Sequence, residues 1–454
     1  MDSKLRESSR SEKNKVIEDQ ESKNISKLKL CSTQVFSNSL LYLILFAVIS
    51  IFLYMERSTV TSSGLRYGVI IDAGSSGTRV HVSLFTLQGG ETLNLEEDHY
   101  FEVKQSLSMC FQNSSSVTNV GYVFSKLLSF VRSIVPEVER PRTPIFLKAT
   151  AGLRLMDTDM IETVLDATRG ILVASEFSFE PSRANVIDGV DESLYGWITV
   201  NSLMSSFSKE SHHTFGILDL GGGSLQIAYD TNYSYDEDES IRELFVADKT
   251  YHVYSQSFLG MGLLEFRRRM YKLLEETGEL TRNPCFYSGA TERIDVDGRE
   301  QSFVNTSGTG DFDSCLSLIN DIFTKEFGFD RESRKLLNTT VDTFIAFAYF
   351  FDRIYTFGLA SQSSRSDLEE VGRYICSEEW HVVQNSYASV RNGGSEHLCF
   401  DMAYIYFLLY DFLEFDRTGK NTWFLQTYHG KEFGWSLGAL FHEMNLLLLE
   451  KEVL

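Results

Sequence analysis

Residues 66–85 read RYGVIIDAGSSGTRVHVSLF, and residues 216–230 repeat the pattern as GILDLGGGSLQIAYD. In each copy an apolar strand ends near an aspartate, a turn of glycine and serine follows, and a second strand of alternating polarity returns. Asp72 and Asp219 occupy the same position in the two copies. One such unit per domain indicates an internal duplication. We therefore predict an α/β chain in which two similar hairpins face each other across a cleft.

The two loops carry the groups that bind phosphate. Closely spaced backbone N–H groups, hydroxyls and one guanidinium favour anions, and small residues let the backbone approach them. The first loop lacks the helix of a dinucleotide fingerprint and the lysine of a P-loop. A single turn of this composition is common as plain structure, but two copies favour phosphate binding. The predicted phosphate-binding residues are Gly74, Ser75, Ser76, Gly77, Thr78 and Arg79, with Gly221, Gly222 and Gly223.

Asp72 and Asp219 stand at the ends of the two apolar strands. Carboxylate oxygens are the hard ligands that Mg²⁺ and Ca²⁺ require, and such a cation beside a substrate phosphate keeps several of its waters. Each aspartate would alternatively only cap its own turn. The correspondence of the two positions favours metal binding.

Three further segments hold groups that can bind a water molecule. Glu192 opens a helix expected over about residues 191–204, where a carboxylate either handles a water proton or merely interacts with the helix dipole. Thr150 lies in a small-residue turn, and Ser224 and Gln226 follow the second loop. Each of these residues alone is equally compatible with a structural role.

Long helices are expected after the second copy, over residues 257–276, 341–357 and 401–415. The last of these is apolar enough to resemble a membrane span. It is too short for one and contains Asp411, so we predict a buried core helix.

The chain has 454 residues and a formal net charge of −21. Its length favours two or three domains, or one large two-lobed body. The negative charge argues against non-specific nucleic-acid binding. An acidic protein that handles anionic nucleotides must neutralise them locally, which favours a metal-dependent site.

An uncharged apolar run from Val35 to Met55 is long enough to span the ~30 Å hydrocarbon core of a bilayer. Lys23, Lys27 and Lys29 precede it, so the positive-inside rule favours a cytosolic N-terminus and a translocated body. A cleaved signal peptide is the alternative, but the long polar segment ahead of the run favours an uncleaved anchor. We predict a single-pass type II membrane protein with a cytosolic tail, an anchor and a linker over residues 1–34, 35–55 and 56–66.

Two features beyond the anchor agree with translocation. Four of the five following cysteines form two sequence-local couples, which suggests disulfides Cys285–Cys315 and Cys376–Cys399, although spacing does not fix the connectivity. Cys110 would remain a free thiol, and the absence of a C-x-x-C pattern argues against a zinc–thiolate site. Sequons for N-glycosylation occur at Asn113, Asn232, Asn305 and Asn338.

Five segments together resemble the conserved regions of the apyrase (GDA1/CD39) family of nucleoside triphosphate diphosphohydrolases. In chain order they are VIIDAGSSGTRVHV, LKATAGLRLM, NVIDGVDESLYGWITVN, GILDLGGGSLQIAY and FGWSLGAL. The resemblance spans the body from Arg66 to the C-terminus. It implies a two-lobed, actin-like fold made of duplicated ribonuclease-H-like units. Lobe I would hold residues 67–188 plus about 425–454, and lobe II residues 189–424.

The resemblance also implies a mechanism without a phosphoenzyme. Glu192 would be the general base for water attack on the terminal phosphate of a nucleoside di- or triphosphate, and Asp72 and Asp219 would hold Ca²⁺ or Mg²⁺ through its water shell. An exposed-type carboxylate has a pKa of ~4.3, so Glu192 is expected to orient the water as much as to deprotonate it. The residues that would position the water are Thr150, Ser224 and Gln226.

The chain departs from the family pattern in two places: Leu225 replaces a threonine, and Ser193 replaces the glycine after the catalytic glutamate. Neither removes an implied role, and both are expected to alter rate or substrate preference by shifting loop geometry. Arg79 resembles the plant and endomembrane members, which favours the Golgi or another endomembrane; those members often prefer diphosphates. A nucleotide-binding chaperone, a sugar kinase or an inactive homologue are the alternatives. The second and third conserved segments favour hydrolysis, because no separate domain remains for a peptide or an acceptor sugar.

Overall fold

The computed structural model describes most of the chain beyond the predicted anchor. The description below concerns the compact unit Arg66–Leu454. The predicted tail, the anchor and nearly all of the linker lie outside the described residues, as do Asn113 and Asn338. In the described part of the chain, no helix combines the length and the apolar character that crossing a membrane requires. The described ranges are 65–88, 92–110, 116–207, 213–233, 240–246, 249–288, 290–295, 303–328, 341–388, 390, 394–415 and 421–452.

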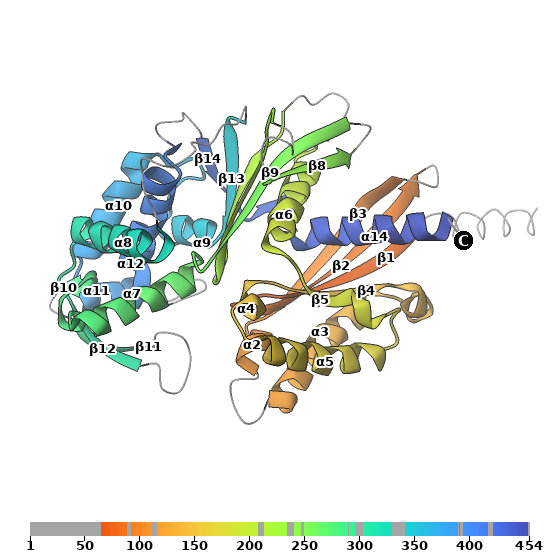
Figure 1. The fold of residues 1–454 in the computed structure, drawn as a ribbon, viewed down its shortest axis with the longest axis horizontal. Helices are drawn as coiled ribbons and strands as arrows, with labels where there is room; N and C mark the ends of the chain where they lie inside the picture. Colours follow the sequence, from red (N-terminus) through yellow and green to blue (C-terminus); the bar gives the residue numbers. More distant parts are fainter. Residues whose placement is uncertain are drawn as a thin grey trace, which may run out of the picture. The chain divides into compact units, whose positions relative to one another are not determined.

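The first lobe is built on a five-stranded sheet with the order β3-β2-β1-β4-β5 (Figure 1). β1 and β4 are parallel, as are β4 and β5, whereas β2 and β3 are antiparallel. Val69, Ile70 and Ile71 of β1 are fully buried, as expected for a central strand covered on both faces. The strands are β1 (Leu65–Ala73), β2 (Thr78–Gln88), β3 (Thr92–Val103), β4 (Ile145–Ala149) and β5 (Ala184–Val186).

The second lobe contains a six-stranded sheet with the order β14-β13-β6-β7-β9-β8. Its path β9-β7-β6-β13-β14 reproduces the strand order and directions of the first sheet, and β8 is an added edge strand. The repeat seen in the sequence is therefore repeated in the topology. The strands are β6 (Gly216–Leu220), β7 (Ser224–Asp230), β8 (Ile241–Val246), β9 (Lys249–Leu259), β13 (Thr343–Ala348) and β14 (Asn421–Phe424).

Helices cover both faces of the first sheet. α3 and α5 pack on one face through an apolar core, and α14 covers the other (Figure 1). α6 packs on the second sheet through Trp197, Ile198 and Val200. The helices are α2 (Leu107–Cys110), α3 (Ser116–Ile134), η1 (Glu137–Arg142), α4 (Ala151–Arg154), α5 (Thr158–Val173), η2 (Pro181–Arg183), α6 (Gly189–Leu203) and α14 (Ser436–Glu452).

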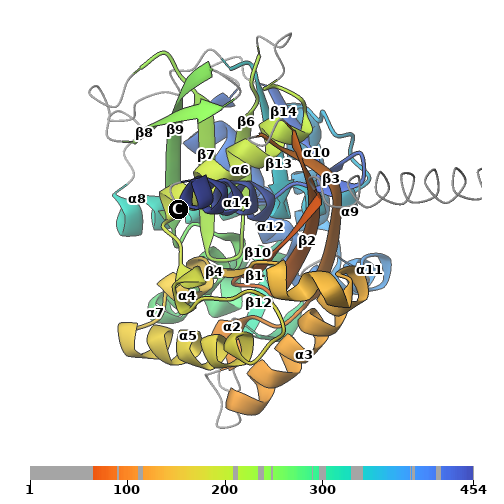
Figure 2. The same cartoon turned by 90° about the vertical axis from the view of Figure 1, so that its right-hand side faces the viewer.

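α6 and α14 lie against each other between the two sheets (Figure 2). Gly438 allows this close crossing, because a Cβ built on it would lie 2.1 Å from the carbonyl oxygen of Tyr195. The Gly438 amide donates a hydrogen bond of 2.8 Å to Thr199 Oγ1. Two sequence segments of the family pattern, FGWSLGAL and VDESLYGW, thus meet where the helices of the two lobes cross.

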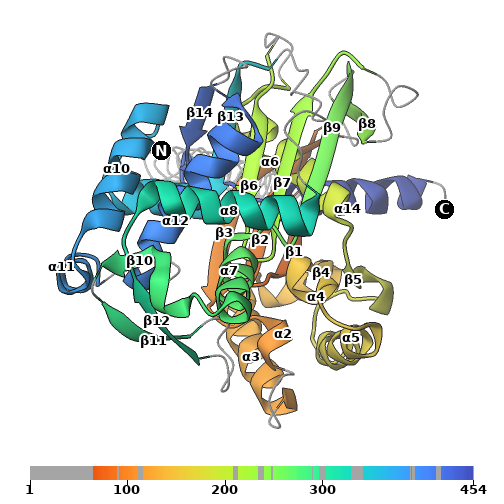
Figure 3. The ribbon, with the colours of Figure 1, turned by 60° about the vertical axis from the view of Figure 1, so that its left-hand side comes forward.

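A helical layer covers the outer face of the second sheet (Figure 3). The apolar stretch at residues 401–415 is buried in it, which confirms the prediction of a core helix. The prediction of one helix over residues 341–357 is wrong, because its first half is a buried strand, β13, that continues directly into α9. These helices are α7 (Leu263–Thr277), η3 (Leu280–Arg282), α8 (Phe312–Phe327), α9 (Tyr349–Thr356), α10 (Arg365–Ser377), α11 (Trp380–Ser386), η4 (Ser395–His397), α12 (Leu398–Tyr406) and the π-helical η5 (Phe407–Phe412).

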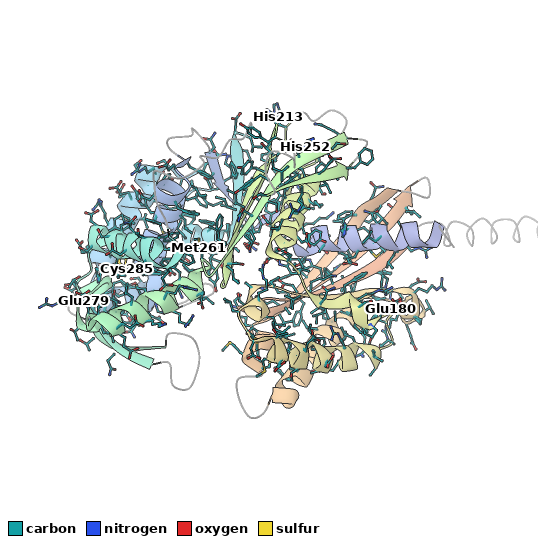
Figure 4. The ribbon with its side chains drawn as sticks, in the orientation of Figure 1. Glu180, His213, His252, Met261, Glu279 and Cys285 are labelled. Atoms are coloured by element: carbon teal, nitrogen blue, oxygen red, sulfur yellow. A yellow bond between two sulfur atoms is a disulfide. The ribbon has the colours of Figure 1, made fainter. Side chains whose placement is uncertain are left out.

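Both predicted disulfides form in this lobe. Cys285–Cys315 joins β10 to α8, and Cys376–Cys399 joins α10 to α12 (Figure 4, Cys285 labelled). Cys110 is free and buried, as predicted. The remaining strands are β10 (Asn283–Ser288), β11 (Thr291–Asp295) and β12 (Phe303–Gly308), and the hairpin of β15 (Thr427–Tyr428) and β16 (Lys431–Glu432).

Candidate active site

The ends of the two duplicated hairpins form the walls of one cleft of about 260 Å³. It receives residues from β1, β2 and α4 of the first lobe and from α6, β6 and the β6–β7 turn of the second. Most of the predicted site residues therefore come together. Those that line the cleft are Asp72, Gly74, Ser75, Ser76, Arg79, Thr150, Glu192, Asp219, Gly221, Gly222, Gly223 and Ser224.

Three predicted site residues do not line the cleft and support it instead. The carbonyl of Gly77 closes the first turn by accepting the Gly74 amide at 3.0 Å. Thr78 is fully buried, and its hydroxyl donates to the carbonyl of Gln105. Gln226 is 1% exposed, and its amide nitrogen donates to Ser224 Oγ at 2.5 Å. Gln226 thus orients Ser224, which does reach the cleft.

The two glycine loops approach each other closely at the floor of the cleft. A Cβ built on Gly222 would lie 2.7 Å from Ser75 Oγ of the first loop. A Cβ on Gly152, two residues after Thr150, would lie 2.8 Å from Ser75 Cα. The missing side chains therefore allow three loops to share one small space, as close backbone approach to an anion requires.

Three carboxyl groups in the cleft, those of Asp72, Asp219 and Glu192, have raised pKa values. Burial raises the pKa of Asp72 to about 6, against the lowering effect of Arg79. Burial and the charge of Asp72 raise the pKa of Asp219 to about 7. Burial raises the pKa of Glu192 to about 8; the Arg154 charge lowers it, whereas the Asp219 and Asp72 charges add to the rise. Carboxyl groups whose pKa values are raised by burial and by neighbouring carboxylates in a cleft indicate a functional site.

The environment of Glu192 differs from the exposed type expected from the sequence. The residue is 6% exposed and lies in the first turn of α6, whose N-terminus is capped by Asp188. Arg154, the last residue of α4, forms an ion pair with it. The expectation of a weak base with an ordinary pKa was therefore wrong, because burial removes the solvent that would stabilise the charge. Sequence reasoning also missed Arg154, although it lies within the ATAGLR segment.

The carboxylates of the cleft fit a divalent cation that is held partly through water. Asp72 Oδ1 is buried and has no hydrogen-bond partner in the described structure. The charge of Asp72 adds to the rise in the pKa of Asp219, and a cation between the two carboxylates would relieve this repulsion. In the described part of the chain, no cluster of three or more His, Cys, Asp or Glu side chains could ligate a metal directly. The site therefore fits a cation such as Mg²⁺ that is held by two carboxylates, water and phosphate oxygens. It does not fit a metal whose ligands all come from the protein.

The remaining lining residues were not predicted as site residues. Phe433 to Ser436, Ala151 and His81 lie inside quoted family segments, but no role was assigned to them. The others come from β3 and the residue after β3, and from the end of β13, α9 and the segment around β16; they carry no shared motif and meet only through the fold. The additional lining residues are His81, Tyr100, Glu102, Lys104, Ala151, Phe347, Ala348, Tyr349, Asp352, Gln426, Glu432, Phe433, Gly434, Trp435 and Ser436.

Ala348 joins β13 to α9 in a conformation that side chains rarely adopt, with φ of 56° and ψ of −127°. Gln426 stabilises this turn, because its Oε1 accepts the Ala348 amide at 3.1 Å. The Gln426 amide nitrogen in turn donates to Glu432 at 2.6 Å. Backbone strain that neighbouring groups hold in place is typical of functional sites, and here it sets the direction in which Tyr349 enters the cleft wall.

The two departures from the family pattern are accommodated without disturbing the cleft. Leu225 is fully buried in the apolar core of the second lobe. Ser193 is also fully buried, and its hydroxyl donates to the carbonyl of Ile227 at 2.7 Å. This hydrogen bond ties α6, and with it Glu192, to strand β7.

Comparisons with known proteins agree with this geometry. The sequence model of the GDA1/CD39 (nucleoside phosphatase) family matches residues 58–454. A protein of Arabidopsis thaliana named probable apyrase 5 is 27% identical over 425 residues, which cover 87% of this chain and 86% of that protein. Ectonucleoside triphosphate diphosphohydrolase 6 of Mus musculus is 28% identical over 403 residues, which cover 85% of this chain and 83% of that protein.

A solved structure of nucleoside triphosphate hydrolases from Neospora caninum has a similar fold. It superposes with a TM-score of 0.62 at 16% sequence identity and covers 88% of this chain and 96% of that chain. At this identity the likeness concerns the fold, which is two-lobed, α/β and actin-like.

Proposed function

This chain belongs to the GDA1/CD39 (nucleoside phosphatase) family and is a nucleotide phosphohydrolase, and we propose that Glu192 is its general base. In this proposal a water molecule attacks the terminal phosphorus of a nucleoside di- or triphosphate and gives its proton to Glu192. The bond from that phosphorus to the bridging oxygen breaks, so the products are inorganic phosphate and a nucleotide shortened by one phosphate. The observation that carries the proposal is the convergence of Glu192 with the two corresponding aspartates on one cleft.

Glu192 has two properties that a general base needs. Its buried carboxyl group has a raised pKa, so its carboxylate accepts a proton more readily than an exposed one. Arg154 forms an ion pair with it and favours the charged form that acts as the base. Because Arg154 contacts one oxygen, the other remains for the water.

Three neighbouring groups would position that water. Ser224 and Thr150 line the cleft from opposite lobes, and each carries a hydroxyl that can accept or donate. Gln226 fixes the direction of the Ser224 hydroxyl, since it also donates to Ser257 at 2.9 Å. Positioning of this kind contributes much of the rate in phosphoryl transfer.

Asp72 and Asp219 would hold Ca²⁺ or Mg²⁺ through its water shell, and the cation would neutralise charge on the phosphate oxygens. The phosphate oxygens would also accept hydrogen bonds from the backbone N–H groups of the Ser75–Ser76 and Gly222–Gly223 turns and from the guanidinium of Arg79. Arg79 already donates to Ser76 Oγ at 3.1 Å, which orients it toward the first loop.

Replacement of the base tests this assignment. In E192Q the amide cannot accept the proton, so kcat for ADP, GDP or UDP should fall by about 100-fold or more, with little change in KM. D191N is the matched control, because Asp191 precedes Glu192 on the same helix and does not line the cleft. An E192Q enzyme that keeps most of its kcat would show that the base lies elsewhere.

Chelation tests the cation. Phosphate release by the full chain should stop on addition of EDTA and return with excess Ca²⁺ or Mg²⁺, and the more effective ion identifies the preferred cation. D72N and D219N should each raise the cation concentration needed for half-maximal rate. Activity that survives chelation would contradict the role of the two aspartates.

We also propose that the body lies on the lumenal or extracellular side of a membrane, with the endomembrane system favoured. The two disulfides support an oxidising compartment. Asn232 and Asn305 are exposed, so a glycosyltransferase can reach both sequons. Glycosidase treatment of the full chain from a eukaryotic cell should therefore increase its gel mobility; a chain without glycan would count against this topology.

A further inference from the structure

His81 lines the cleft but has no part in the mechanism described so far. It lies two residues beyond Arg79 on β2, so both side chains leave the same face of the strand and both reach the cleft. The ring packs against Tyr100, its cross-strand partner, with centroids 5.1 Å apart. Only 5% of His81 is exposed, so its orientation is fixed by its neighbours.

Asp98, which does not itself line the cleft, holds this ring. His81 Nδ1 lies 3.0 Å from Asp98 Oδ2, and Asp98 Oδ1 accepts a hydrogen bond from Ser83 at 2.6 Å. The Asp98 side chain is 2% exposed, so solvent screens its charge little. Across the described residues, Asp98 is the one hydrogen-bond partner recorded for the ring, which leaves Nε2 available to a ligand.

The surroundings favour the protonated ring. Burial alone would lower the pKa of His81, but the charge of Asp98 and its hydrogen bond outweigh burial and raise the pKa. Glu432 on β16 and Asp72 on β1 face the ring from other elements and act in the same direction. Arg79 is the nearby cation on its own strand, and Tyr100 is the neighbour on β3.

The cleft needs cationic donors. Among the described residues that line it, six carry carboxyl groups, whereas two, Arg79 and Lys104, carry a permanent positive charge. A nucleotide brings further negative charge into this space, so an additional charged N–H donor strengthens binding. The six carboxyl residues are Asp72, Glu102, Glu192, Asp219, Asp352 and Glu432.

We propose that His81, kept as an imidazolium by Asp98, donates a hydrogen bond from Nε2 to a phosphate oxygen of the bound nucleotide. The inference rests on the proposed function of the cleft. When the ring loses its proton, Nδ1–H stays on Asp98 and Nε2 presents a lone pair, which repels a phosphate oxygen. Nucleotide binding therefore weakens as the pH rises through the pKa of His81. Asp98 acts through His81 and is a positioning residue.

The pH dependence of KM tests this proposal on the full chain, with ADP, GDP and UDP as substrates and Mg²⁺ in excess. H81Q should raise KM by about 10-fold or more near pH 6, because a charge-assisted hydrogen bond is lost. The ratio of the mutant KM to the wild-type KM should approach one at high pH. D98N keeps a hydrogen-bond acceptor but removes the charge, so the rise in KM should begin about one pH unit lower or more. Neither substitution should lower kcat by a factor as large as the change in KM.

The chain offers a matched control on the same hairpin. His99 pairs with Glu97 at 3.0 Å, but both side chains are exposed and neither lines the cleft. H99Q should leave the KM profile unchanged. If the wild type is active and the KM profile of H81Q or D98N is identical to the wild-type profile, the inference is overturned and the proposed function stands. A wild-type chain that releases phosphate from none of the nucleotides would overturn the proposed function and the inference with it.

Discussion

Arg154 determines how well Glu192 can act as a base at neutral pH. Burial and two neighbouring aspartates favour the protonated carboxyl group, and the ion pair with Arg154 opposes them. The two residues come from different segments of the family pattern and from different lobes, since Arg154 ends α4 and Glu192 opens α6. The base and the cation that pairs with it are therefore contributed by different lobes and meet in the cleft.

Replacement of Arg154 should change the pH profile of turnover. In R154Q the opposing charge is lost, so the pKa of Glu192 rises and kcat at neutral pH falls by about 10-fold for each unit of that rise. The acidic limb of the kcat profile should move to higher pH, whereas R154K should largely preserve it. Measurement of kcat from pH 5.5 to 9 with saturating nucleotide and cation decides the matter. An unshifted limb in R154Q would show that the ion pair does not tune the base.

At the scale of the element, the duplicated strand–turn–strand units could be predicted because aspartate and glycine stand at fixed places in both copies. The junction between β13 and α9 could not be predicted from the sequence. Its strand, Thr343–Ala348, is an apolar run without alternation, which periodicity cannot distinguish from a buried helix. The cleft residues on β3 and β16 were missed for a related reason, since they meet the predicted loops only through long-range pairing. His81 stood inside a quoted motif, yet its role depends on Asp98, which only the β2–β3 register brings near.

The approach of the two glycine loops can be tested by adding one methyl group. A Cβ on Gly222 would lie 2.7 Å from Ser75 Oγ, whereas a Cβ on Gly221 meets its nearest atom, the Ser224 carbonyl oxygen, at 3.3 Å. In G222A the Ser75 side chain must rotate away or the loops must shift, so kcat/KM should fall by about 10-fold or more, because displacement of phosphate-positioning groups is costly. G221A is the milder control and should retain more activity. Equal activity in the two variants would contradict the close contact of the loops.

At the scale of the molecule, a buried cluster of charges lies inside the helical layer of the second lobe. Asp401 lies there between Arg267 and Arg353, each of which donates a hydrogen bond to it. Asp401 is fully buried, and the cations lower its pKa against the effect of burial. Such a cluster is costly to form and specifies one arrangement of the helices around it, so we expect it to fix the helical layer that supports β13 and the cleft wall.

His397 lies beside this cluster and should make the protein sensitive to acid. Burial, with the charge of Arg267, lowers the pKa of His397 to about 3, whereas an unfolded histidine titrates near 6.5. Between these pH values the unfolded chain binds a proton that the folded chain excludes. The folded state therefore loses stability as the pH falls from about 6.5 toward 3, by up to about 1.4 kcal/mol per pH unit.

Substitution of His397 isolates this contribution. In H397Q the free energy of unfolding in urea should fall less steeply between pH 6.5 and 4.5 than in the wild type, by about one proton. H381Q is the control, because His381 is 71% exposed on α11 of the same lobe and its removal should leave the slope unchanged. The cleft carboxyl groups titrate in all three proteins and act in the opposite sense, since their raised pKa values favour the folded state at low pH. Their contribution is the same in each protein and cancels in the comparison. Parallel curves of unfolding free energy against pH for H397Q and the wild type would therefore mean that His397 is not held neutral in the fold.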